Sequence, residues 1–124
     1  MDPREDLQTT LEREGAATLH VRFEGKSASR EAGRELAPLF DGVIAIATAE
    51  QRDIVMHFER LSYFNSSTIA ALVQFIRAVQ KVGRGVSVVY DGAQKWQVLS
   101  FDALKRAMRP FETGKGPSVS FREA

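Results

Sequence analysis

The chain has no cysteine and two histidines among its 124 residues. The lack of cysteine excludes disulfides, thiolate metal sites and cysteine nucleophiles, and it suits a reducing compartment. His20 and His57 are the whole supply of imidazole ligands, so a histidine-based metal site is not expected either. We therefore predict a protein that uses neither a metal nor a cofactor.

Long apolar runs are missing as well. No stretch approaches the roughly 20 apolar residues of a membrane span, and residues 1–15 lack the apolar core of a signal peptide. The 17 basic and 16 acidic residues leave a formal net charge of +1, which attracts neither nucleic acid nor anionic membranes. A basic group in the C-terminal third is interpreted as a solvated helix face: Lys95, Lys105, Arg106, Arg109 and Lys115. We expect a cytoplasmic protein that binds neither nucleic acid nor membrane.

A hydrophobic content of 44% over 124 residues suffices for one compact domain. Alternating apolar residues predict strands over 18–24, 53–61, 86–90 and 118–121. Helical spacing predicts helices over 36–47, from 67 to a left-handed cap at Gly83, and over 96–108. Residues 1–15 are expected to be a mobile lead-in with room for a short strand or turn, and 25–29 and 114–117 to be turns or loops.

Helices between successive strands require crossover connections, so the central strands should be parallel. The predicted fold class is α/β, with one mixed, mostly parallel sheet of about four to five strands and about three helices packed mainly on one face. Pro38 falls inside the first helical stripe. Because proline lacks a backbone donor, this helix is predicted either to begin near Ala37 or to bend there.

Four small polar residues stand together between the central strand and the second helix: Asn65, Ser66, Ser67 and Thr68. Such residues cap the free N–H groups of a first helical turn, but capping needs one of them. A hydroxyl at a helix N-terminus is also a suitable phosphoacceptor, because the free N–H groups and the helix dipole stabilise the added charge. From the residues alone, capping and phosphorylation both remain open.

The run Ile54-Val55-Met56-His57-Phe58, the segment 65–68, the following helix and the strand 86–90 together resemble the STAS domain of anti-sigma factor antagonists. In that family the strand is followed by Asp-Ser-Ser-Gly, and a partner kinase that is also an anti-sigma factor phosphorylates the first serine. The matching residue here is Ser66, with Asn65 in place of the aspartate and Thr68 in place of the glycine. Asn-Ser-Ser-Thr-Ile is also similar to the Asn-Thr-Ser-Ser-Ile of SiaC-like bacterial phosphoproteins. The resemblance implies a single STAS-like domain over residues 16–124.

A second polar cluster follows the strand 86–90 and includes Asp91 and Trp96. In a parallel sheet it should lie at the same edge as residues 65–68, so both segments are predicted to form one partner-binding surface. Trp96 suits an interface anchor, and the alternative is that it packs in the core with Leu99. Asp91 is interpreted first as a residue that stabilises its own turn.

The two histidines are placed on strands away from the hydroxyl segment, so a converging nucleophile and base are not expected, and we predict no enzymatic activity. The leading hypothesis is a phosphorylation-regulated protein-binding module of the partner-switching kind. Ser66 is the expected acceptor, with Ser67 and Thr68 as alternatives. The resemblance implies a serine kinase or anti-sigma-like ATPase and a phosphatase as partners. The alternative is a structural scaffold, in which the edge strand 118–121 or the Trp96 surface mediates assembly, such as a homodimer.

Overall fold

The computed structural model describes residues 7–27, 30–108 and 119–124. These residues form one five-stranded sheet and three helices. Their order along the chain is β1 (Gln8–Glu14), β2 (Thr18–Ser27), α1 (Ala32–Glu50), β3 (Asp53–Phe64), α2 (Ser66–Lys81), β4 (Val86–Tyr90), α3 (Lys95–Met108) and β5 (Val119–Glu123). The predicted α/β fold class is confirmed.

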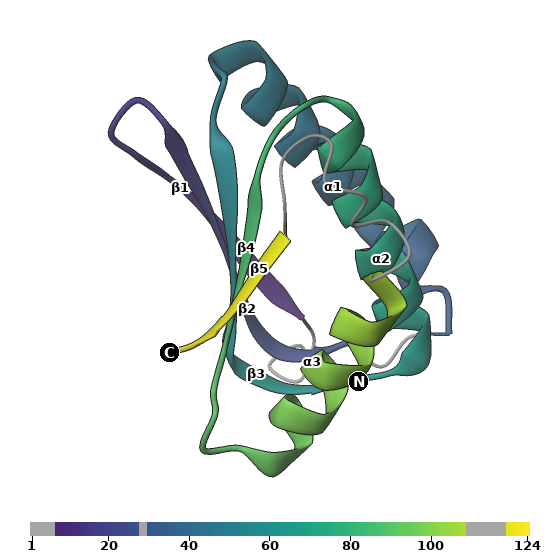
Figure 1. Ribbon diagram of the computed structural model, residues 1–124. Helices are drawn as coiled ribbons and strands as arrows, with labels where there is room; N and C mark the ends of the chain where they lie inside the picture. The colour runs from purple at the N-terminus through teal and green to yellow at the C-terminus, as the bar shows by residue number, and fades with distance from the viewer. Residues whose placement is uncertain (1–6, 28–29, 109–118) are drawn as a thin grey trace.

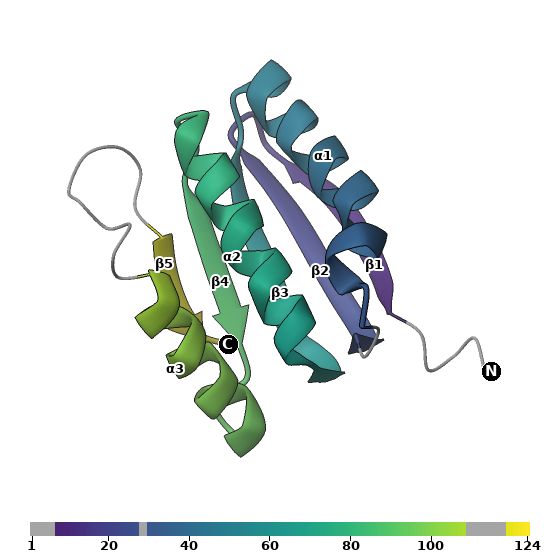
Figure 2. The ribbon, with the colours of Figure 1, turned by 90° about the vertical axis from the view of Figure 1, so that its right-hand side faces the viewer.

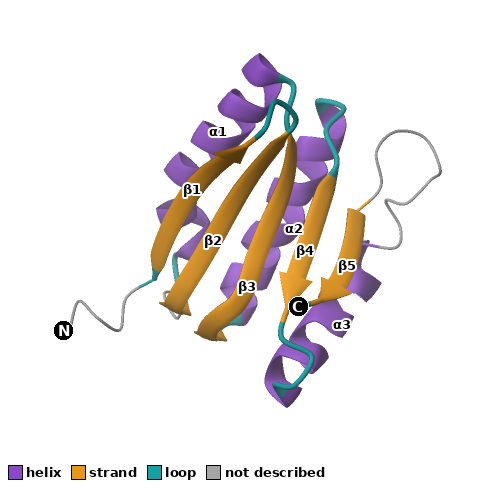
Figure 3. Cartoon of the chain, turned by 90° about the vertical axis from the view of Figure 1, so that its left-hand side faces the viewer, coloured by secondary structure: helices purple, strands orange, loops and turns teal. Residues whose placement is uncertain are grey.

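The strands lie in the sheet in the same order as in the sequence, β1-β2-β3-β4-β5. β1 runs antiparallel to β2, and the remaining neighbours are parallel. All three helices cover one face of the sheet (Figures 1 and 2), whereas Figure 3 shows the opposite face with no helix in front of it. We call this uncovered side the open face. The helices bury the apolar side of each strand, so the open face carries mostly polar side chains, together with the apolar Val55 and Val89.

The core lies between the sheet and the helices. Leu19 and Val21 of β2 are fully buried, as are Ile76 of α2 and Phe101 of α3. His20 and Arg22, at the alternate positions of β2, point to the open face, as the period of a strand requires. Helix α1 packs on α2 through a stacked pair of rings, Phe40 and Phe75, with centroids 4.4 Å apart.

Residues 8–14 form the edge strand β1, and a short strand was one of the structures expected within the lead-in over 1–15. Residues 1–6 lie outside the described part. Gly15, with φ of 58°, turns β1 back onto β2, so that Glu14 pairs with Thr18. The guanidinium of Arg13 forms two parallel contacts of 2.8 Å with the carboxylate of Glu50 at the end of α1. Arg13, followed by Arg52, lowers the pKa of Glu50 to about 2. A salt bridge therefore attaches this edge strand to the helical layer.

Strands β2 and β3 are both longer than the sequence predicted. β2 continues through the expected turn at Gly25 to Ser27, and β3 continues through Tyr63 to Phe64, with Ser27 paired to Phe64. Register shifts next to Glu24 and Gly25 accommodate the extension, and Gly25 adopts a positive φ of 93°. Two neighbouring strands thus extend beyond β4, which ends at Tyr90.

Helix α1 begins at Ala32, before Pro38 rather than at it. The backbone hydrogen bond that Pro38 cannot donate would have gone to the carbonyl of Arg34. Because Arg34 is exposed, water can bond to this carbonyl instead. The helix ends at Gln51, which adopts the left-handed conformation with φ of 54°. The cap at Gly83 is confirmed by its φ of 80°. The predicted last strand is present as Val119–Glu123, while the loop 114–117 and the basic residues Arg109 and Lys115 lie outside the described residues.

Candidate functional site

Asn65 joins β3 to α2 and caps the helix. Its backbone is extended (φ −98°, ψ 178°), and its side-chain Oδ1 accepts a hydrogen bond of 3.0 Å from the backbone N–H of Thr68. The backbone N–H of Asn65 donates to the carbonyl of Ser27 at 3.0 Å, which continues the β2–β3 pairing to this point. Asn65 therefore fixes the place where the strand changes into the helix.

Thr68 is buried and bonded to its surroundings. The residue is only 3% exposed, and its hydroxyl donates a hydrogen bond of 2.8 Å to Oδ1 of Asn65. The Ser27 hydroxyl lies 2.6 Å from the Thr68 hydroxyl and acts as the donor to it, since the Thr68 proton is already used. Thr68 thus links β2, the cap and α2 through the hydrogen bonds of its hydroxyl. A glycine at this position has no side chain and cannot form these bonds.

Ser66 and Ser67 differ from Thr68 and from each other. Ser67 is half-buried, and its hydroxyl donates to the backbone carbonyl of Arg30 at 3.2 Å. Ser66 is exposed at the first position of α2, and its hydroxyl bonds to no residue in the described part of the chain. Of the three neighbouring hydroxyls, that of Ser66 is therefore the most accessible to another protein.

Asp91 stabilises its own turn, as its first interpretation predicted. Its carboxylate accepts from the Gln94 side-chain amide at 3.0 Å and from the Ala93 backbone N–H at 2.9 Å. These bonds lower the pKa of Asp91, with the Gln94 contact as the larger cause. A partner-binding role for Asp91 remains a prediction.

Trp96 combines features of both of its predicted roles. Its ring packs edge-on against Phe64 with centroids 5.6 Å apart, and its indole N–H donates to the Gln94 side chain at 2.8 Å. The residue is nevertheless only partly buried. Leu99 is 60% exposed, so the expectation that it shares a core position with Trp96 is wrong. Leu99 lies on the outer face of α3, whereas Gln97 and Phe101 occupy the inner one.

Gln97 is the site residue that the sequence did not single out. It is completely buried, and its amide nitrogen donates to the carbonyls of Phe58 (2.9 Å) and Leu61 (3.1 Å). Its amide oxygen accepts from the backbone N–H of Asp91 at 2.7 Å. Because β4 ends at Tyr90, one side chain supplies the hydrogen bonds that β4 no longer gives to β3.

The two predicted segments are therefore connected, but through α3 rather than through Asp91. Gln97 bonds to β3 just before the hydroxyl segment, and Trp96 packs on Phe64, the residue that precedes Asn65. Asp91 bonds within its own turn and to Gln97. The structure brings the first turn of α3 to the end of β3 and links Asp91 to β3 only through the side chain of Gln97, among the contacts of the described residues.

Two kinds of feature are absent from the residues that the structure describes. They include no group of three or more histidine or acidic side chains arranged to hold a metal ion. They also include no helix that is long and apolar enough to cross a membrane.

Replacing Asn65 by alanine should lower the free energy of unfolding by about 1–2 kcal/mol, because the cap and the acceptor of the Thr68 hydroxyl are both lost. Asn65→Asp keeps an oxygen at the same place and adds a charge that the helix dipole favours, so its loss should stay under about 0.5 kcal/mol. Urea unfolding of both variants measures the difference. Equal losses in the two variants would contradict the capping role.

The class of fold is now defined: a mixed sheet with helices on one face, in which a strand leads through a hydroxyl-rich cap into a helix, is the STAS-like arrangement. Among solved structures, the chain is similar to SiaC of Pseudomonas aeruginosa, with a TM-score of 0.58 and 17% identity over 94% of this chain and 99% of that one. It is also similar to the anti-sigma factor antagonist SpoIIAA in its unphosphorylated form, with a TM-score of 0.54 and 19% identity over 94% and 89% of the two chains.

An anti-sigma factor antagonist from Mycobacterium paratuberculosis gives a TM-score of 0.55 and 15% identity over 97% of this chain and 90% of that one. No family model and no curated protein sequence matches the chain. These similarities extend over almost the whole length of both partners in each comparison, so the STAS-like fold is shown for the chain as a unit.

Proposed function

We propose that the chain is a phosphorylation-regulated protein-binding module of the partner-switching kind, with Ser66 as the phosphoacceptor. The observation that carries the proposal is the contrast among the three hydroxyls. Thr68 is buried, Ser67 is bonded to the Arg30 carbonyl, and Ser66 is exposed and unbonded within the described residues. A kinase needs an accessible hydroxyl, and Ser66 meets that condition best.

The surroundings of Ser66 suit a phosphate. The residue is the first of α2, where free backbone N–H groups and the positive end of the helix dipole stabilise an anion. Lys26 is paired with Tyr63, and the Arg30 carbonyl meets Ser67, so two exposed basic residues belong to the chain segments beside this helix end. A phosphoserine brings about two negative charges to the surface, enough to change which partner binds there.

The partner-binding surface consists of the exposed start of α2 and the neighbouring Trp96. An indole that is partly buried and held by Phe64 and Gln94 offers contact area with little loss of conformational freedom. The partners that fit are a serine kinase or anti-sigma-like ATPase and a phosphatase that removes the modification, in a reducing cytoplasm. The similar proteins with known roles are anti-sigma factor antagonists, which supports protein partners over a small-molecule substrate.

A binding role is preferred to catalysis because no base contacts the Ser66 hydroxyl among the residues that the structure describes. Both histidines point to the open face, where they contact acidic side chains, and neither contacts Ser66. The buried bonds at Asn65 and Thr68 hold the helix start in shape rather than activating a nucleophile.

The proposal predicts that the protein isolated from its own cells contains a fraction heavier by one phosphoryl group. Phosphatase treatment should remove this extra mass. Fragmentation of the peptides should place the phosphoryl group on Ser66. Ser66→Ala should abolish the heavier form. Ser67→Ala is the matched control, since it removes the adjacent hydroxyl and should leave the modification in place. Modification that survives in Ser66→Ala contradicts the assignment.

Binding provides the second part of the same test. A partner that copurifies with the protein should bind Ser66→Ala and Ser66→Asp with affinities that differ at least about tenfold, since a charge is placed inside the contact. Equal affinities, together with an oligomer that does not respond to phosphorylation, favour the scaffold alternative through the sheet edges β1 and β5.

A further inference from the structure

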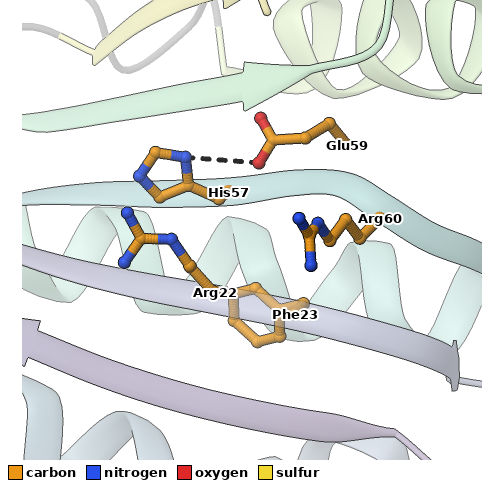
Figure 4. Close-up of a pocket in the computed structure, with 5 residues that line it drawn as sticks. All are labelled: Arg22, Phe23, His57, Glu59 and Arg60. Carbon is orange, nitrogen blue, oxygen red and sulfur yellow. Dashed lines mark ion pairs between the residues drawn. The ribbon is translucent and has the colours of Figure 1, made fainter.

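The open face carries a chain of four titratable side chains that the proposed function does not use. Glu14 of β1 lies 2.8 Å from Nε2 of His20 on β2. Nδ1 of His20 lies 2.8 Å from Nε2 of His57 on β3. Nδ1 of His57 lies 3.3 Å from Glu59 on the same strand, the ion pair drawn in Figure 4. Three strands are thus linked by one row of polar contacts.

The register of the sheet explains how this row arises. Thr18 pairs with Glu14 and Arg22 pairs with His57, so His20 is the diagonal neighbour of both Glu14 and His57. The two imidazoles are mostly shielded, with side-chain exposures of 12% for His20 and 16% for His57. Their rings lie 5.0 Å apart at an angle of 32°. Packing therefore holds both rings where their nitrogens must interact.

Counting protons defines the charge that this geometry favours. Carboxylates only accept, so each contact with a glutamate needs a proton on the imidazole nitrogen, and the contact between the rings needs one proton between two nitrogens. Three contacts require three protons. Two neutral histidines carry two, so one contact is left without a proton. Two imidazolium ions carry four, which places two N–H groups against each other at 2.8 Å.

We propose that His20 and His57 form a single proton-binding site, which holds one proton beyond the neutral pair and rejects a second, so that the charge and stability of the open face depend on pH near neutrality. Glu14 and Glu59 stabilise the first extra proton from the two ends of the row. Like-charge repulsion and the facing N–H groups oppose the second.

Of the other charged groups around the pair, the acidic ones favour protonation of the histidines and the basic ones oppose it. The charged groups on the same face, element by element, are Glu12 of β1, Arg22 and Glu24 of β2, Asp53 and Arg60 of β3, and Arg122 of β5, while β4 contributes the uncharged Ser87 and Val89. Arg22 and Arg60 line a cavity of about 380 Å³ beside His57 and Glu59 (Figure 4). Arg22 pairs with Glu12 at 3.5 Å and Arg60 with Glu24 at 3.1 Å, so the local field is partly balanced.

The pKa of His57 is lowered, so its surroundings as a whole oppose its protonation. Burial is the largest cause; the charge of Glu59 raises this pKa, and those of Arg22 and His20 lower it further. Because the rings share a proton, the two titration steps belong to the pair rather than to either residue. The acid step lies below the ordinary histidine value of about 6.5.

The consequence for stability follows from linkage. Between the acid step and about pH 6.5 the unfolded chain holds more protons than the folded pair, so stability rises with pH. The contribution of the pair is therefore lost as the pH falls from about 6.5 through the acid step. A His57 that is simply buried would keep this profile when His20 is replaced.

The test is a titration of the full chain, labelled with ¹⁵N-histidine, by NMR between pH 5 and 9. We expect two steps separated by at least about one pH unit, with the lower of them below 6.5. His57→Gln should reduce this to a single step. The difference in urea-unfolding free energy between the wild type and the double variant His20→Gln/His57→Gln should fall as the pH is lowered from about 6.5 through the acid step.

Two glutamate variants distinguish the site from a general charge effect. Glu59→Gln removes the carboxylate at one end of the row and should move the upper step to lower pH. Glu24→Gln is the matched control on the same face, because Glu24 pairs with Arg60 and not with an imidazole, and it should leave both steps in place. Coincident titration of the two histidines would overturn the proposal without recourse to any variant.

Discussion

Replacing Phe101 by alanine is expected to lower the free energy of unfolding by about 4 kcal/mol, the typical cost of truncating a large aromatic ring in a packed core. Phe101 is fully buried on the inner face of α3. Its ring lies 5.1 Å from that of Phe58, 5.4 Å from that of Phe64 and 5.3 Å from that of Tyr90. The substitution therefore leaves a cavity where α3, β3 and β4 meet.

Phe101→Leu is the matched comparison, since it keeps most of the volume and loses the ring contacts, at a cost of under about 1.5 kcal/mol. Urea unfolding followed by circular dichroism measures both. Because Phe101 and Trp96 both pack against Phe64, the alanine variant should also expose Trp96, whose fluorescence should shift to longer wavelength in the folded state. If alanine and leucine at this position cost the same, a cavity left by the missing ring is not the cause of the loss.

Gln97→Leu should lower the free energy of unfolding by about 3 kcal/mol, although leucine is more apolar and of similar size. The substitution leaves the carbonyls of Phe58 and Leu61 and the N–H of Asp91 buried without their partner, and each such group costs about 1–3 kcal/mol if water does not reach it. The amide of Asp91 should also exchange its hydrogen faster.

Leu99→Gln is the control for this prediction because it makes the reverse change on the exposed side of the same helix. It should alter stability by less than about 0.5 kcal/mol. A neutral Gln97→Leu would mean that the three backbone groups find water or new partners, and that the side chain is not what continues the hydrogen bonding of β3.

The main elements were predictable because their apolar periodicity is strong. Val86–Tyr90 is a short β-branched run between turns, and the spacing of Leu72, Ile76 and Val79 defines the inner face of α2. β1 had no such pattern. All seven of its side chains are exposed, so the strand forms through backbone pairing after the Gly15 turn and carries no apolar alternation.

The sequence predicted the hydroxyl residues of the candidate site but not the residues that hold them in place. The composition of residues 65–68 marked the cap, but it could not tell which hydroxyl is buried, because that depends on Ser27 arriving from a distant strand. Gln97 looked like an ordinary polar helix residue for the same reason: its partners lie 36 and 39 positions earlier in the chain. The histidine pair depends on strand register, which alternation alone does not supply.

The order of the strands in the sheet has a consequence for how the molecule is made. Each strand pairs with the one that precedes it in the chain, from β1 at one edge to β5 at the other. A chain that leaves the ribosome N-terminus first therefore always offers the next strand an edge that has already been synthesised. The sheet can grow in the direction of translation, one strand at a time, without waiting for a distant segment to complete an inner layer.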